Sequence, residues 1–107
     1  MNNKNNASTI QRWEHPGGKL IELGAEKLSD AELLSIIIGT GTKDKSAEDI
    51  AKEIMNKYGG FRGIQGQPLK EFLRFKGLGD VKIIRIAAVF EIATRIVKKV
   101  LEEYEED

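Results

Sequence analysis

Apolar residues recur at helical spacing along most of the chain, and short polar or glycine-containing segments separate the periodic stretches. Ser29 followed three residues later by Glu32 is the pattern of a capping box, so a helix is expected to begin there and to end at Gly39. Ser46 is a second N-cap residue, and the helix after it is expected to end at Gly59 and Gly60. No segment shows the clean apolar and polar alternation of a half-buried strand. The pattern predicts an all-α fold.

Two weaker periodic stretches complete the first three quarters of the chain. A short helix is expected from about Gly18 to Leu23, with Gly24 ending it. The segment 61–67 is interpreted as a compact connector. It leads to Pro68, which suits the first turn of a further helix. The apolar face of that helix comprises Leu69, Phe72, Leu73 and Phe75.

The last helix is expected to run from Asp80 to about Leu101. It is apolar nearly all round between Ile83 and Ala93, which is typical of a buried helix. We therefore expect it to pass through the centre of the domain. In total the chain is predicted to form about five helices joined by short loops.

Two glycine turns form an internal repeat. Gly39-Thr40-Gly41 and Gly77-Leu78-Gly79 lie 38 residues apart, and each is followed by a helix. The apolar residues before the turns correspond as well, since Leu34 matches Phe72 and Ile37 matches Phe75. A helix, glycine turn and helix that occurs twice is typical of paired helix-hairpin-helix motifs, of which the first is degenerate here because its loop is longer.

The second turn has the chemistry of a phosphate site. Its glycines lack a Cβ and allow close approach of another molecule, while Leu78 is expected to point inward. The helix that follows begins with unpaired backbone amides, which together with the helix dipole attract an anion. Alternatively, Asp80 caps this helix with its own carboxylate and fills the site. The candidate DNA-binding residues are Lys76, Gly77, Gly79, Asp80, Val81, Lys82 and Arg85, with Gly39, Gly41, Lys43 and Lys45 in the first turn.

Charge is distributed unevenly along the 107 residues. Lys and Arg number 17, as do Asp and Glu, so the formal net charge is zero, which at first argues against a nucleic-acid partner. Residues 68–99 carry eight basic and three acidic side chains, a local charge of +5, and residues 102–107 then carry −5. Any DNA site is therefore expected to be local, independent of sequence and sensitive to salt.

Composition excludes several kinds of site. Without cysteine there is no disulfide, thiol nucleophile or Cys-based zinc site, and a single histidine, His15, rules out a multi-histidine metal site. The segment 39–46 resembles a nucleotide-binding P-loop, but Asp44 replaces the second glycine and a helix is expected before it. We find no catalytic constellation and expect no metal and no cofactor. His15 is interpreted as an exposed loop residue and Trp13 as a packing anchor.

The organisation expected is one domain over residues 12–101, after a disordered segment 1–11 and before an acidic tail or linker at 102–107. No apolar run is long enough to cross a membrane and the start of the chain is unlike a signal peptide, so the expected location is the cytoplasm.

The segment from Gly24 to Ile96 closely resembles the N-terminal domain of the RadC family of bacterial proteins annotated for DNA repair. The most specific pieces are LSDAELLSIIIGTGTKDKS, GGFRG and KGLGDVK. The resemblance implies a helix-hairpin-helix fold in which Gly77, Gly79 and Lys82 occupy the positions used toward DNA phosphates. Two departures are Ile83, where the family usually has alanine, and His15-Pro16-Gly17-Gly18, where it usually has a basic Arg-Pro-Arg segment.

Complete RadC-like proteins continue into a second domain that resembles JAB/MPN metalloproteases, and this sequence stops before any such motif. Two hypotheses follow. In the first, the chain is a non-enzymatic, sequence-independent DNA-binding module that contacts backbone phosphate. In the second, it is a protein-interaction or scaffold domain that positions a metalloprotease-like domain, and the hairpin is purely structural.

Overall fold

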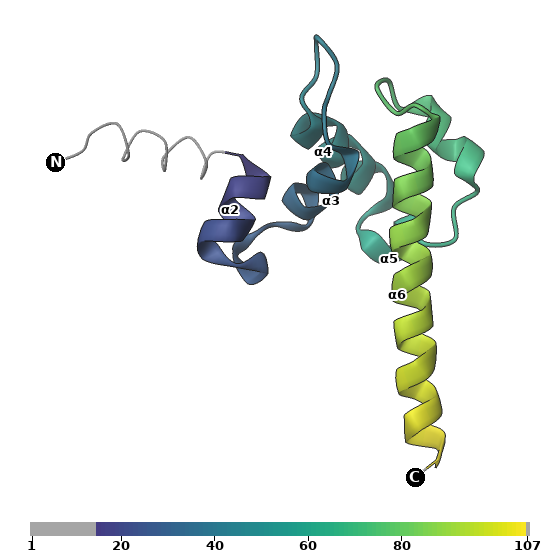
Figure 1. Cartoon of the computed structure of the whole chain (residues 1–107). Coiled ribbons are helices and arrows are strands. Elements are labelled where there is room, and N and C mark those ends of the chain that lie inside the picture. Colours follow the sequence, from purple (N-terminus) through teal and green to yellow (C-terminus); the bar gives the residue numbers. More distant parts are fainter. Residues whose placement is uncertain (1–14, 107) are drawn as a thin grey trace, which may run out of the picture.

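The computed structural model describes residues 15–106, and within them every regular element is helical (Figure 1). The all-α prediction is therefore confirmed for this part of the chain. The expectations for residues 1–11 and Trp13 lie outside the described residues. The elements are α2 (Pro16–Leu23), the 3-10 helix η1 (Ala25–Lys27), α3 (Asp30–Ile38), α4 (Ala47–Tyr58), α5 (Phe61–Ile64), the 3-10 helix η2 (Leu69–Arg74) and α6 (Asp80–Glu106).

Helix starts and ends follow the local sequence signals. At the start of α3 the Glu32 N–H donates to Ser29 Oγ at 3.1 Å, and the Ser29 N–H donates to Glu32 Oε1 at 2.8 Å, so the capping box is complete. At the start of α4 the Asp49 N–H donates to Ser46 Oγ at 3.0 Å. Gly59 follows α4 in the left-handed conformation, at φ 80°. These boundaries confirm the predicted helices.

Three local expectations need correction. α2 begins at Pro16 rather than Gly18, because proline suits the first helical turn. Part of the expected connector forms the single turn α5. The helix after Pro68 is a 3-10 helix in which Leu69 and Leu73 are exposed. Of the four expected apolar residues, only Phe72 within this helix and Phe75, the extended residue after it, reach the core.

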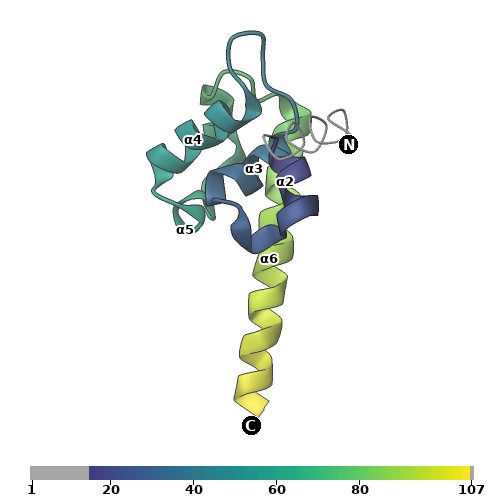
Figure 2. The ribbon, with the colours of Figure 1, turned by 90° about the vertical axis from the view of Figure 1, so that its left-hand side faces the viewer.

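The core lies where α3, α4 and the first half of α6 meet (Figures 1 and 2). Tyr58 at the end of α4 contacts the rings of Phe72 and Phe75, with centroid separations of 5.8 and 6.1 Å. Leu78, the central residue of the second glycine turn, is 5% exposed, so its expected inward orientation is confirmed. The other buried apolar residues of this core include Leu34, Ile38, Ile50, Ile54, Ile64, Ile83 and Ile86.

An ion pair attaches α2 to α3. Lys19 Nζ donates to both carboxylate oxygens of Glu32, at 3.1 and 3.0 Å. The Ser29 backbone N–H and this lysine lower the pKa of Glu32 below its ordinary value, although partial burial opposes the effect. Glu32 thus closes the start of α3 and also holds the preceding helix.

The expectation that α6 passes through the centre of the domain is wrong. Only its first half packs, through Ile83 and Ile86, whereas Ile84 and Ile92 on the same stretch are exposed. The second half projects beyond the other helices, and the helix continues to Glu106 (Figures 1 and 2). Apolar character all round a helix does not by itself establish that neighbours cover every face. No helix among residues 15–106 has the length and apolar character needed to cross a membrane.

Candidate nucleic-acid interface

The two glycine turns lie against each other at the end of the molecule opposite the C-terminal end of α6 (Figures 1 and 2). Gly77 has φ 99°, and a Cβ on it would lie 2.7 Å from Ile50 Cδ1 and 2.9 Å from Thr42 Cγ2. Lys82 Nζ donates to the Thr40 carbonyl oxygen of the first turn in a short contact. The repeat seen in the sequence therefore becomes one surface.

The start of α6 leaves backbone donors open. The Ile83 N–H donates to the Gly79 carbonyl oxygen at 3.1 Å, which is the first hydrogen bond of the helix. No described residue accepts a hydrogen bond from the amides that precede it, which belong to Gly79, Asp80, Val81 and Lys82. The Asp80 carboxylate is exposed and makes no hydrogen bond with a described residue, so the alternative in which it caps α6 is not the arrangement adopted. The helix thus presents the orphan donors and positive dipole end typical of an anion site.

Gly79 differs from Gly77 in what the fold demands of it. Its φ lies outside the positive range, and a Cβ built on it would meet nothing within 4 Å. Neither backbone strain nor packing within the described chain therefore requires glycine there. The missing side chain leaves the amides of the first α6 turn accessible to another molecule.

The basic candidates are placed unequally. Arg85 is exposed and reaches back toward the first turn, where its Nη1 would lie 3.5 Å from a Cβ on Gly39. Lys82 is half-buried because of its contact with Thr40, whereas Lys76 is exposed beside Gly77. The exposed Val81 adds no charge but lies on the same helix turn as the open amides.

The first turn is closed on itself. A Cβ on Gly41 would lie 2.0 Å from the Lys45 carbonyl oxygen, and the Thr42 N–H donates to that same oxygen at 2.7 Å. Lys45 also forms a short ion pair with Glu53 of α4, whereas Lys43 is exposed. Because Ser46 caps α4, the donors at this helix start are partly used. The segment before this turn is the helix α3, as expected, whereas a P-loop follows a strand.

The sequence also matches the UPF0758 N-terminal family model over residues 8–84. The chain belongs to the UPF0758 family. This is the RadC-like family to which the motifs pointed.

Curated UPF0758 relatives are much longer than this chain. This chain is 39% identical over 101 residues to a UPF0758 protein of Coprothermobacter proteolyticus. The aligned region covers 92% of this chain and 43% of that relative. It is 44% identical over 90 residues to a UPF0758 protein of Cellvibrio japonicus. Here the aligned region covers 81% of this chain and 40% of the relative. The chain therefore spans about two fifths of the length of these UPF0758 proteins. No solved structure matches it.

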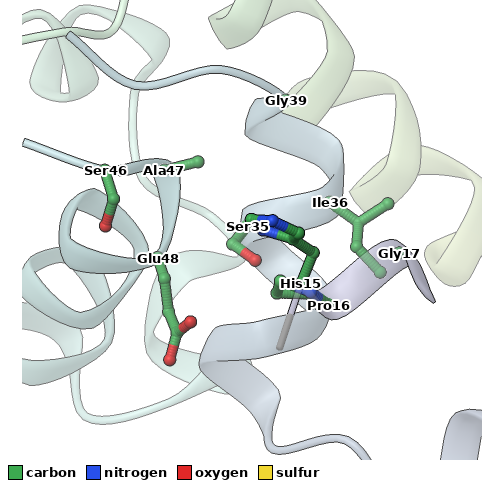
Figure 3. A pocket seen from close by; sticks show the side chains of 9 residues that line it. All are labelled: His15, Pro16, Gly17, Ser35, Ile36, Gly39, Ser46, Ala47 and Glu48. Carbon is green, nitrogen blue, oxygen red and sulfur yellow. The ribbon is translucent and has the colours of Figure 1, made fainter. Parts of the chain in front are cut away.

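A separate hollow of about 370 Å³ lies between the starts of α2 and α4 and the side of α3 (Figure 3). His15, which is exposed as expected, lines it from just before α2, and Ser35 and Ile36 line it from α3. Glu48 lines it from α4 and is paired with Lys52 at 3.4 Å. Among residues 15–106 of this UPF0758 chain, no group of three or more His, Cys, Asp or Glu is arranged to hold a metal ion.

The open turn was one of two alternatives that the sequence allowed, and the way in which the two turns are joined was missed. The contact between Lys82 and Thr40 spans 42 residues of sequence, and the ion pair of Lys45 removes a cation that had been a candidate for phosphate. No sequence motif near these residues predicts either contact. The buried Ile83 lies in the core rather than on the hairpin surface.

Proposed function

We propose that this region is a non-enzymatic, sequence-independent DNA-binding module of a UPF0758 protein, of the helix-hairpin-helix type. It contacts backbone phosphate through the turn at Gly77 to Lys82. The observation that carries the proposal is the start of α6, where four amides have no acceptor among the described residues and Gly79 leaves open space in front of them.

Lys82 serves this site without losing its contact with the first turn. A lysine ammonium has three donors, and one of them is used by the Thr40 carbonyl. The remaining donors are available to a phosphate oxygen placed at the amides. In this proposal the contact with Thr40 restrains the ammonium, so that less side-chain entropy is lost when it meets the phosphate. Lys76, just before this segment, and Arg85, three residues after it, add positive charge.

The experiment is a salt titration of binding to a fluorescent DNA duplex, compared for the natural chain and Lys82→Ala. The binding constant falls as salt rises, so the slope of log K against log salt is negative, and loss of one phosphate contact makes it less steep by about 1. Lys57→Ala is the matched control, because it removes the same charge near the C-terminal end of α4, whereas the first glycine turn precedes the N-terminal end of that helix. We expect it to bind as the natural chain does. No binding at low salt, or equal slopes for both variants, would contradict the proposal.

The competing function is a protein-interaction or scaffold domain that positions a metalloprotease-like domain. The observation in its favour is the exposed apolar second half of α6, together with relatives more than twice as long as this chain. In that case Lys82→Ala leaves function unchanged, while apolar-to-charged changes on α6 abolish it.

A further inference from the structure

The proposed phosphate contact leaves unused an open groove between η2 and the first turn of α6, two elements that pack against each other. The groove has a volume of about 350 Å³, which is within the range of sites that hold a small organic group. Its walls are mostly apolar, and one of its two charged residues, Asp80, is also the first residue of α6. The residues that line the groove are Leu69, Lys70, Leu73, Asp80, Ile83 and Ile84.

Apolar side chains around this groove are left uncovered. Leu69 is 52% exposed, Leu73 is 59% exposed and Ile84 is 63% exposed. The apolar face expected for the helix after Pro68 is therefore divided, because Phe72 enters the core while the two leucines face the groove. Apolar side chains that are exposed singly need no explanation, whereas a group of them around a hollow is typical of a binding surface.

The groove and the open amides meet at the first turn of α6. The Asp80 N–H is one of the amides with no acceptor among the described residues, and the same residue lines the groove. In a nucleotide the base is joined to its phosphate through a single sugar. A phosphate bound at these amides would therefore bring the base of its own nucleotide beside the groove.

Charge at the groove favours the neutral part of a nucleotide. The Asp80 carboxylate makes no hydrogen bond or ion pair with a described residue, and it would repel a second phosphate or an acidic peptide. It can accept a hydrogen bond from an N–H of a base, and every base carries one. Lys70 at the groove and Lys76 before the turn are both exposed and supply positive charge for the flanking phosphates.

The state of the DNA decides whether a base can reach the groove. In an intact duplex the bases are paired and stacked, whereas an unpaired nucleotide turns its base outward at little cost. We infer that the groove binds the base of an unpaired nucleotide whose phosphate lies at the open amides. This inference rests on the proposed function and specifies the preferred DNA as one with a single-stranded segment. Because every base has a ring face, the contact keeps binding independent of sequence.

Two fluorescent duplexes that differ only in a single-stranded overhang test this inference. One overhang consists of thymidines, and the other consists of abasic residues, which keep every phosphate and lack the bases. Fluorescence anisotropy should show that the natural chain binds the thymidine overhang about tenfold more tightly. Equal affinity for the two DNAs would overturn the inference and leave the phosphate contact of the proposed function standing. Absence of binding to either DNA at low salt would contradict both.

Substitutions separate the groove from the phosphate contact. Leu73→Gln removes an exposed apolar wall of the groove, so it should bring the two affinities close together. Ile96→Gln is the matched control, since Ile96 is also 59% exposed and lies about 18 Å from Ile84 along α6. It should keep the preference for thymidines. Lys82→Ala should weaken binding to both DNAs by a similar factor. A preference that survives Leu73→Gln would place the base elsewhere and overturn the inference.

Methyl resonances report the position of the base. The ring current of a bound base shifts the resonances of methyl groups beside it, so the thymidine overhang should shift those of Leu69, Leu73 and Ile84. The abasic overhang should leave these methyl resonances nearly unchanged, while both overhangs shift the amide resonances of Gly79 and Asp80. Methyl resonances that respond to neither DNA would overturn the inference.

Discussion

The two glycine turns share a sequence pattern but differ in how many of their glycines, charges and backbone amides are already used in contacts within the fold. In the first turn, Gly41 makes room for the Lys45 carbonyl, Lys45 pairs with Glu53, and Ser46 caps the next helix. In the second turn only Gly77 is needed for packing. Gly79 and the amides after it are left open toward solvent.

The difference separates a structural turn from one that can bind a ligand. A glycine with positive φ or a crowded Cβ position is explained by the fold, and nothing further needs to be inferred from it. A glycine with neither property, in front of unpaired amides, is explained better by another molecule. The first turn therefore acts as a platform for the second, through Thr40 and Thr42.

The largest effect is expected from Gly77→Ala. The new Cβ would meet Ile50 and Thr42 at less than 3 Å, and alanine disfavours φ 99°. We expect a loss of about 3 kcal/mol in the free energy of unfolding, measured by urea denaturation. Gly79→Ala is the matched control and should cost less than about 1 kcal/mol. Equal losses for the two variants would remove the distinction between the glycines.

The next effect concerns binding rather than folding. Gly79→Ser supplies a good N-cap residue, so the stability of α6 should be kept or slightly raised. Its hydroxyl would accept a hydrogen bond from the first-turn amides and occupy the space of the phosphate. We expect affinity for duplex DNA to fall about tenfold, or about 1.4 kcal/mol, in a fluorescence anisotropy assay. Unchanged affinity would mean that the open amides do not contact DNA.

The smallest effect is expected at the start of α3, where, unlike at the start of α6, side chains of the helix's own capping box bond to backbone amides. Hydrogen bonds from the Ser29 N–H and Lys19 lower the pKa of Glu32 in the folded state. A lowered pKa stabilises the fold above the ordinary pKa of 4.5, and this contribution is lost as the pH falls through the folded value. Glu32→Gln should therefore be less stable at pH 7 by up to about 1 kcal/mol.

The pH dependence of that variant supplies its check. Thermal unfolding between pH 6 and about pH 3 should show a smaller loss of stability for Glu32→Gln than for the natural chain. A parallel loss in both proteins would show that other carboxylates control the acid response. The same substitution should not alter DNA affinity, because Glu32 lies at a different helix start.

Local signals predicted most of the helix starts and ends. Capping residues such as Ser29 and Ser46 act within one turn, so their effect can be inferred from neighbouring letters. The inward orientation of Leu78 followed from its place between two glycines. The open state of the amides at Gly79 was one of two alternatives, and choosing between them required the position of the Asp80 carboxylate.

Features that depend on distant residues were missed. The single turn α5 contains Gly63, a residue that usually weakens a helix. Glycine is needed there because a Cβ would lie 1.8 Å from the Tyr58 carbonyl oxygen. The uncovered face of α6 was not foreseen because the sequence shows apolar residues but not their neighbours. The contact between Lys82 and Thr40 joins two turns that only the tertiary fold brings together.

The most direct test of the central claim is to follow the backbone amide resonances while short duplex DNA is added at low salt. We predict that the largest shift changes occur at Gly79, Asp80, Val81 and Lys82, with smaller changes at Thr40 through its contact with Lys82. The same titration with Gly79→Ser should reduce them. Changes confined to the second half of α6, or no change at the open amides, would contradict the account.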